Sequence, residues 1–303
     1  MKLPLTLINT HKNISEAYTA TDTYIKDNAE IADTLSQYLW ALQESVYLVP
    51  QTHQNYLSGH FFPFSESYHE LENSLELARQ GFYRYSLYAL RCVLELGMLG
   101  LFYDKDDQSY KDIQEWIQSI DPTPYFRKSL RQLFELLNFQ VLNSKYNLQQ
   151  EAEDLYSSLS DFVHVRGYNY SSTGQSHADI NKFNEGAFIK YVDSMRSVVR
   201  CIVTMTLLKY PLGMQVIPID EKFGLEAPTG GLISEFSREM ILTILDSNIK
   251  GVLQTISDND TTVQEMMDYI RTLPSLTDEE RLKQESDWEE FRRTRIQRNS
   301  EEN

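Results

Sequence analysis

Two charged residues lie in the middle of the most apolar helix that the sequence predicts. The stretch Tyr83–Tyr103, YRYSLYALRCVLELGMLGLFY, is almost continuously apolar, yet it contains Arg91 and Glu95. Residues four apart share one face of a helix, so the two side chains are placed to form an ion pair. An unpaired buried charge is too costly to retain, and each of the two therefore needs a partner. We favour a structural ion pair, and the alternative is a functional polar cluster between helices.

A second polar segment, LYSSLSDFVHVRG, ends a later predicted helix. Its polar side chains Asp161, His164 and Arg166 are the expected partners of the charged pair. His164 has apolar neighbours, which predicts a half-buried imidazole that carries a proton, binds a ligand or serves as a hydrogen-bonded core residue. We favour the core role. If the cluster is instead functional, its candidate catalytic residues are His164, Arg166, Arg91 and Glu95.

Metal binding is a further alternative. Glu66 and His69 are three residues apart on a predicted helix, and so are Asp161 and His164. Di-iron helical bundles use Glu-x-x-His pairs together with further glutamates. Pairs of this kind also arise by chance in a chain rich in acidic residues. The primary interpretation therefore includes no metal and no cofactor.

The elements that must position these residues are all predicted to be helices. Apolar residues recur at intervals of three and four in long segments that short polar loops connect, which predicts an all-α antiparallel helical bundle. Single helices are expected at Phe126–Leu142 and at Leu232–Ile256. Residues 1–213 form the expected bundle domain, and residues 214–303 form a smaller C-terminal helical region with a charged tail.

The start of that C-terminal region differs in composition from the bundle. Residues 214–229 contain prolines and glycines and two short apolar runs that could be extended. The tail, Ser275–Asn303, is rich in charge and has Trp288 and Phe291 as large apolar residues. We expect it to form a surface helix. Its four arginines between positions 292 and 298 favour a solvated face or a partner-docking segment.

Composition restricts the class of protein. The formal net charge of −16 repels phosphate backbones, because affinity for nucleic acid depends largely on Lys and Arg. No DNA partner is predicted, whereas a local basic groove for RNA stays possible. The two cysteines lie in apolar helical runs and imply no disulfide framework. The N-terminus has no signal-peptide pattern, and charges interrupt Tyr83–Tyr103, so we expect a cytoplasmic protein without a membrane partner.

The segments LRCVLE at Leu90–Glu95 and LSDFVH at Leu159–His164 together resemble the HEPN superfamily of helical bundles, particularly its uncharacterised bacterial members. The resemblance covers the middle third to half of the chain. Nuclease members of that family cleave RNA without metal, using an Arg that is separated from a following His by four to six residues. The corresponding positions before His164 are Ser157, Ser158 and Leu159, so the catalytic motif is absent and its roles cannot be transferred.

The resemblance implies a non-catalytic module that binds a partner protein or associates with itself through an aromatic-rich helix face. An alternative of another class is a metal-independent RNA endonuclease of a stress or phage-defence system, which would use His164 with Arg166 or Arg91. A second alternative is a di-iron carboxylate protein.

Overall fold

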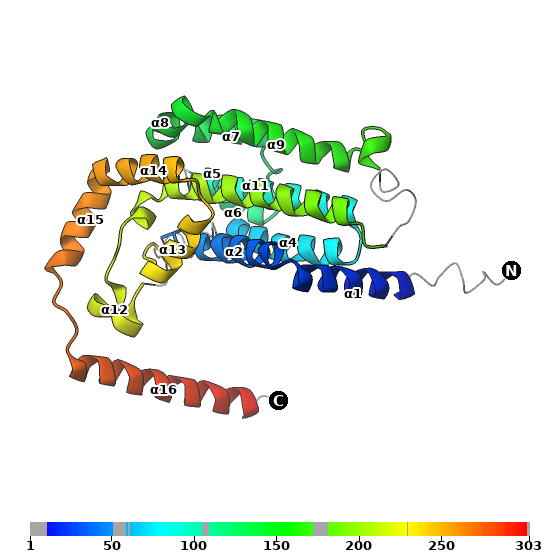
Figure 1. The fold of residues 1–303 in the computed structure, drawn as a ribbon. Helices are drawn as coiled ribbons and strands as arrows, with labels where there is room; N and C mark the ends of the chain where they lie inside the picture. The colour runs from blue at the N-terminus through cyan, green and yellow to red at the C-terminus, as the bar shows by residue number, and fades with distance from the viewer. Residues whose placement is uncertain are drawn as a thin grey trace.

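The computed structural model describes residues 11–50, 59, 61–104, 109–171, 181–228 and 230–301. Within these ranges the chain forms helices and no strand, which confirms the all-α prediction (Figure 1). The long helices are α1 (His11–Asp27), α2 (Ala29–Val46), α4 (Phe62–Arg79), α5 (Tyr83–Tyr103), α9 (Leu148–Val163), α11 (Glu185–Lys209) and α16 (Asp278–Glu301). The shorter ones are α6 (Ser109–Ile117), α7 (Phe126–Leu133), α8 (Leu137–Tyr146), α12 (Ile219–Lys222), α13 (Glu235–Thr243), α14 (Ser247–Asn259) and α15 (Thr261–Thr272). The described chain also contains the short 3-10 helices η2 (Tyr168–Tyr170), η3 (Pro211–Met214) and η4 (Gly224–Glu226).

Helix α5 is the centre of the bundle. It packs against the preceding helix α4 as an antiparallel hairpin, and it also contacts α11, α9, α7 and α6. Two glycines allow the closest approaches. A Cβ atom at Gly100 would lie 2.5 Å from ring carbons of Phe64 on α4, and one at Gly97 would lie 2.8 Å from Ile202 on α11. The small residues of α5 therefore set its distance from both neighbours.

Helix α5 is the one helix of the described chain with the length and apolar character of a membrane span. Of its most apolar window, 67% is buried inside the protein. This burial is the behaviour expected of a core helix.

Two predicted helices are each divided in the structure. The segment predicted as Phe126–Leu142 is α7 and α8, because Leu136 takes extended backbone angles between them. The segment predicted as Leu232–Ile256 is α13 and α14, and Asp246 is extended in the same way. Both bends keep the apolar residues on either side in contact with the core. The spacing of apolar residues is the same in one continuous helix and in two shorter helices joined by a bend. The sequence pattern therefore did not show the breaks.

The main hydrophobic core continues across position 214. Residues of α13 and α14, including Ile241 and Leu253, belong to the same cluster as α5 and α11. A second, small cluster joins α15 to the connecting segment after α11 and consists of Ile217, Val263, Met267 and Ile270. Of the short apolar runs that could be extended, Val216 and Ile217 lie in irregular backbone between η3 and α12, and Leu225 lies in η4, so none of them forms a strand.

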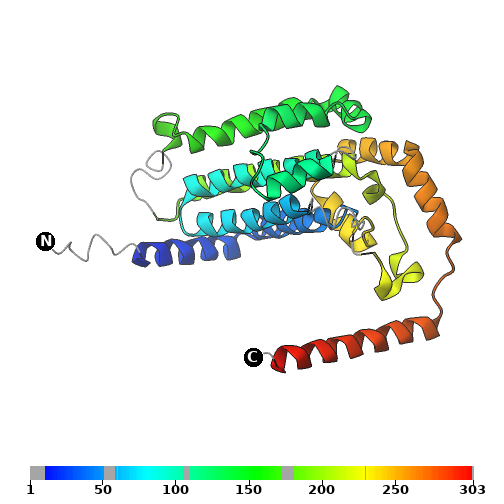
Figure 2. The ribbon, with the colours of Figure 1, turned by 180° about the vertical axis from the view of Figure 1, so that it is seen from behind.

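Helix α16, the predicted surface helix, stands apart from the rest of the fold. Figures 1 and 2 show it running beside the bundle and separated from it. Its contacts with the other described elements are near its start, where it meets η4.

Candidate functional site

The charged pair on α5 forms the ion pair that its spacing predicts. Arg91 Nη2 lies 3.0 Å from Glu95 Oε1 and donates a second hydrogen bond of 2.8 Å to the Tyr156 hydroxyl on α9. The guanidinium carbon lies 4.8 Å from the centre of the Tyr156 ring. That ring stacks on Phe126 of α7, with centroids 4.3 Å apart and planes only 5° from parallel. The pair therefore ties three helices together.

The electrostatics of Arg91 favour its charged form. Burial lowers its pKa, but the Glu95 carboxylate and the Tyr156 hydroxyl outweigh that effect and raise the pKa above its usual value. Its Nε is buried and has no hydrogen-bond partner among the described residues. The exposed fractions of the Arg91 and Glu95 side chains are 16% and 32%. The ion pair is therefore largely enclosed by the protein.

The expectation that Asp161, His164 or Arg166 would pair with Arg91 is wrong. The partner from α9 is Tyr156, because the two helices are antiparallel in a register that a second arginine also fixes. Arg84 donates from Nε to the Phe162 carbonyl at 2.9 Å and from Nη2 to the Val163 carbonyl at 3.3 Å. His164 thus lies level with the start of α5, about 12 Å along the helix axis from the contact of Arg91, at 1.5 Å per residue.

The end of α9 is an exposed surface. His164 is exposed and not half-buried as expected, and its side chain makes no hydrogen bond with another described residue. Arg166 is 78% exposed and lies 3.4 Å from Asp161. The backbone between them is strained, since Val165 has a φ of +46°, a conformation that β-branched residues rarely adopt. Helix α9 ends at Val163, and the chain reverses at Val165.

The acidic and histidine pairs do not assemble into a metal centre in the described chain. His69 is exposed, and its Nδ1 lies 3.4 Å from a carboxylate oxygen of Glu72. Within the described ranges, no three His, Cys, Asp or Glu side chains are grouped closely enough to hold a metal ion.

Neither cysteine has the environment of a nucleophile. Burial, with smaller effects from Glu95 and Glu70, raises the pKa of the Cys92 thiol to about 11. Burial likewise raises the pKa of Cys201 to about 12. Both thiols are protonated near neutral pH, and a protonated thiol is a poor nucleophile.

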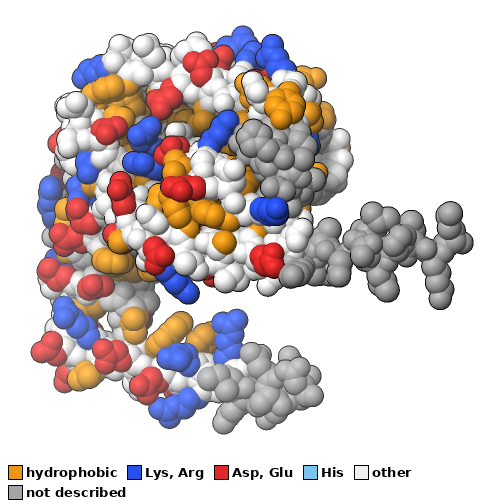
Figure 3. Space-filling view, turned by 45° about the vertical axis from the view of Figure 1, so that its right-hand side comes forward, with side chains coloured by type: hydrophobic (Ala, Val, Ile, Leu, Met, Phe, Trp, Pro, Cys, Tyr) orange, Lys and Arg blue, Asp and Glu red, His pale blue; other side chains and the backbone are white. Residues whose placement is uncertain are grey.

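The charged tail carries an exposed aromatic pair in the middle of α16. Trp288 is ten residues after the first residue of the helix, and Phe291 is ten residues before the last. Their rings stack with centroids 5.6 Å apart, and they are 51% and 53% exposed. Figure 3 shows hydrophobic side chains on this helix, with open space between it and the bundle.

Hydrogen bonds attach the start of α16 to the segment around η4. Gln284 accepts a hydrogen bond from the Leu225 amide at 3.0 Å and donates one to the Phe223 carbonyl at 3.2 Å. The preceding linker is attached to α12, where Lys222 donates to the Leu273 carbonyl at 2.9 Å. Trp288 is four residues after Gln284 and shares its face, so the aromatic pair extends the same face past the point of attachment.

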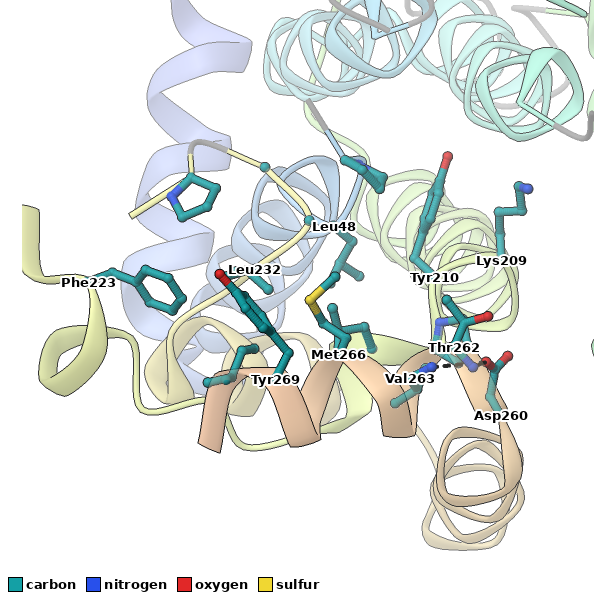
Figure 4. Close-up of a pocket in the computed structure, with 17 residues that line it drawn as sticks. Leu48, Lys209, Tyr210, Phe223, Leu232, Asp260, Thr262, Val263, Met266 and Tyr269 are labelled. Atoms are coloured by element: carbon teal, nitrogen blue, oxygen red, sulfur yellow. Dashed lines mark hydrogen bonds between the residues drawn. The ribbon is translucent and has the colours of Figure 1, made fainter. Parts of the chain in front are cut away.

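A pocket of about 510 Å³ lies where the end of the bundle meets α15 and the connecting segment (Figure 4). Met266 and Tyr269 of α15 point toward Leu48 and Leu232, which form the opposite wall. The sequence prediction missed this pocket, although the proline- and glycine-rich stretch after position 213 marked one of its walls. The lining residues are Leu48, Pro50, Lys209–Leu212, Phe223, Pro228, Gly230–Leu232, Asp260, Thr262, Val263, Met266, Tyr269 and Ile270.

Comparisons with known proteins give no relative: no family model, no curated protein and no solved structure matches this chain. The HEPN resemblance stays a prediction from the sequence.

Proposed function

We propose that this protein is a non-catalytic interaction module that associates with a second copy of itself through helix α16. The observation that carries this proposal is the stacked, half-exposed pair of Trp288 and Phe291 at the midpoint of a helix that stands apart from the fold. Large aromatic residues contribute most of the energy at protein interfaces when they become buried.

The charge of α16 favours an antiparallel second copy as the partner. The first half, DEERLKQESDWEE, carries seven acidic and two basic side chains, and the next five residues, FRRTR, carry three arginines and no acid. When two such helices cross antiparallel at their midpoints, each acidic half lies beside the partner's basic segment. Complementary charges of this kind set partner choice and orientation in helix pairs.

The same geometry brings specific side chains together. The aromatic pairs of the two helices meet at the crossing point, and Glu285 of one copy comes next to Arg292 of the other. Glu285 and Arg292 flank Trp288 at helical spacing of three and four residues, so both lie beside the aromatic face. Association should be weak and reversible, because two aromatic side chains per chain bury less than the roughly 800 Å² per partner of a stable interface.

Sedimentation velocity over a wide concentration range tests the proposal. We expect a monomer–dimer equilibrium for the unchanged protein and at least a tenfold weaker one for the double variant Trp288→Ala, Phe291→Ala. Leu282→Ala is the matched control, since Leu282 is 65% exposed on another face of α16. A protein that stays monomeric at every concentration, or a double variant that associates as before, would contradict the proposal.

The exposed end of α9 supports a second candidate, metal-independent RNA cleavage by His164 with Arg166. The supporting observation is the strained Val165 between these two exposed residues, because strain of this kind is concentrated at functional sites. The expected result is RNA cleavage in the presence of a metal chelator, lost in His164→Ala and retained in His69→Ala. No cleavage under any condition would remove this candidate.

A further inference from the structure

We propose that the pocket between α15 and the end of the bundle is a binding site for a neutral, apolar small molecule. Its volume of about 510 Å³ lies within the roughly 300–1,000 Å³ that is typical of ligand pockets. Its walls are mostly aliphatic and aromatic, with a few polar groups at the edge. This site is separate from the α16 surface of the proposed function.

The walls of the pocket are fixed in place by contacts between distant parts of the chain. The Gly231 amide donates a 2.8 Å hydrogen bond to the Tyr47 carbonyl, which attaches the connecting segment to the end of α2. Gly231 has a φ of +85°, and a Cβ there would lie 3.3 Å from the backbone of Pro50. Glycine at this position therefore permits the close approach that forms one wall.

The charged residues that line the pocket are already paired. The Lys209 ammonium lies 3.8 Å from Asp104. The Asp260 carboxylate accepts hydrogen bonds from the Thr262 and Val263 amides at 3.0 Å and 3.1 Å, which cap the start of α15. A charged ligand would have to compete with these pairs or lose its hydration without a counter-ion. The pocket therefore favours an uncharged ligand.

The opening is formed by side chains that can adapt to a ligand. Met266 and Tyr269 are 41% and 59% exposed and stand over the pocket from α15. Methionine is flexible and polarizable and fits apolar ligands of irregular shape. Tyr269 adds an aromatic face and one hydroxyl. These groups fit a ring system or branched aliphatic molecule with one or two hydrogen-bonding groups.

Titration with Nile red, a neutral polycyclic dye, tests the proposal on the full chain. We expect saturable enhancement of its emission with one dye per chain. Met266→Trp places a larger side chain in the opening and should weaken binding at least tenfold. Glu265→Trp is the matched control on the same helix, because Glu265 is exposed and does not line the pocket. Thermal melts of both variants must match that of the unchanged protein.

Two further binding measurements test whether the ligand is neutral and whether the dye binds in this pocket. The anionic dye 1-anilinonaphthalene-8-sulfonate should bind more weakly than Nile red. If it binds as tightly or more tightly, and Met266→Trp abolishes that binding, the inference of a neutral ligand is overturned. The variant Trp288→Ala, Phe291→Ala should bind Nile red unchanged. Absence of saturable binding, binding that Met266→Trp leaves intact, or loss of binding in the α16 variant would overturn the site.

Discussion

Helices α5 and α16 are of similar length, 21 and 24 residues, but their exceptional residues are in opposite situations. In α5 the exceptions are charges in an apolar helix, and Arg91 and Glu95 have partners within the fold. In α16 the exceptions are aromatic rings in a charged helix, and the rings of Trp288 and Phe291 stack mainly on each other. The first arrangement supports a structural role for the charged pair of α5, and the second is the basis of the proposed interface on α16.

The largest expected difference between the two helices is the loss of folding stability when a leucine is replaced by alanine. Leu94 of α5 is fully buried, so Leu94→Ala should lower the free energy of unfolding by about 2–5 kcal/mol. Leu282→Ala in α16 should change it by less than about 0.5 kcal/mol, since the side chain is exposed. Chemical denaturation measures both. Similar losses for the two variants would mean that α16 is as much a part of the core as α5.

The ion pair of α5 should have a smaller effect. Arg91→Ala leaves Glu95 without its cation, and we expect the free energy of unfolding to fall by about 1–3 kcal/mol. Breaking a fully buried pair costs roughly 3–5 kcal/mol, and the effect should be smaller here because Glu95 is partly exposed. The double variant Arg91→Met, Glu95→Leu should recover most of that loss, because apolar residues of similar size can replace a structural pair. Denaturation midpoints report both changes. A double variant no more stable than Arg91→Ala would contradict a structural role.

The smallest effect should come from His164. Its side chain is exposed and has no hydrogen bond with another described residue, so His164→Ala should alter stability by less than about 0.5 kcal/mol. The same denaturation experiment, repeated at pH 5 and pH 8, checks this. A clear loss of stability at either pH would show that the imidazole has a structural partner after all.

The sequence predicted much of the fold because periodicity reports which residues face a core. It located α5 and placed its charges correctly as an ion pair at four-residue spacing. It did not identify Tyr156 as the partner from α9. That identity depends on the register between two helices, which Arg84 and the carbonyls at the end of α9 fix through contacts distant in sequence.

Contacts between segments that are distant in sequence also explain why the pocket was missed and why His164 is exposed. The pocket is formed by segments around positions 48, 210, 231 and 266, and no local pattern shows that they meet. His164 has apolar neighbours in sequence, but the helix ends at Val163 and the chain reverses at Val165. Apolar neighbours predict burial only while the helix continues.

The most direct test of the contrast between α5 and α16 is a charge-exchange experiment on α16. Glu285→Arg alone and Arg292→Glu alone should each self-associate at least tenfold more weakly than the unchanged protein in sedimentation velocity, because each places like charges beside one another. An equimolar mixture of the two variants should associate again, since every crossing then pairs an arginine with a glutamate. Single variants that associate normally, or a mixture that stays monomeric while the unchanged protein dimerises, would contradict the account.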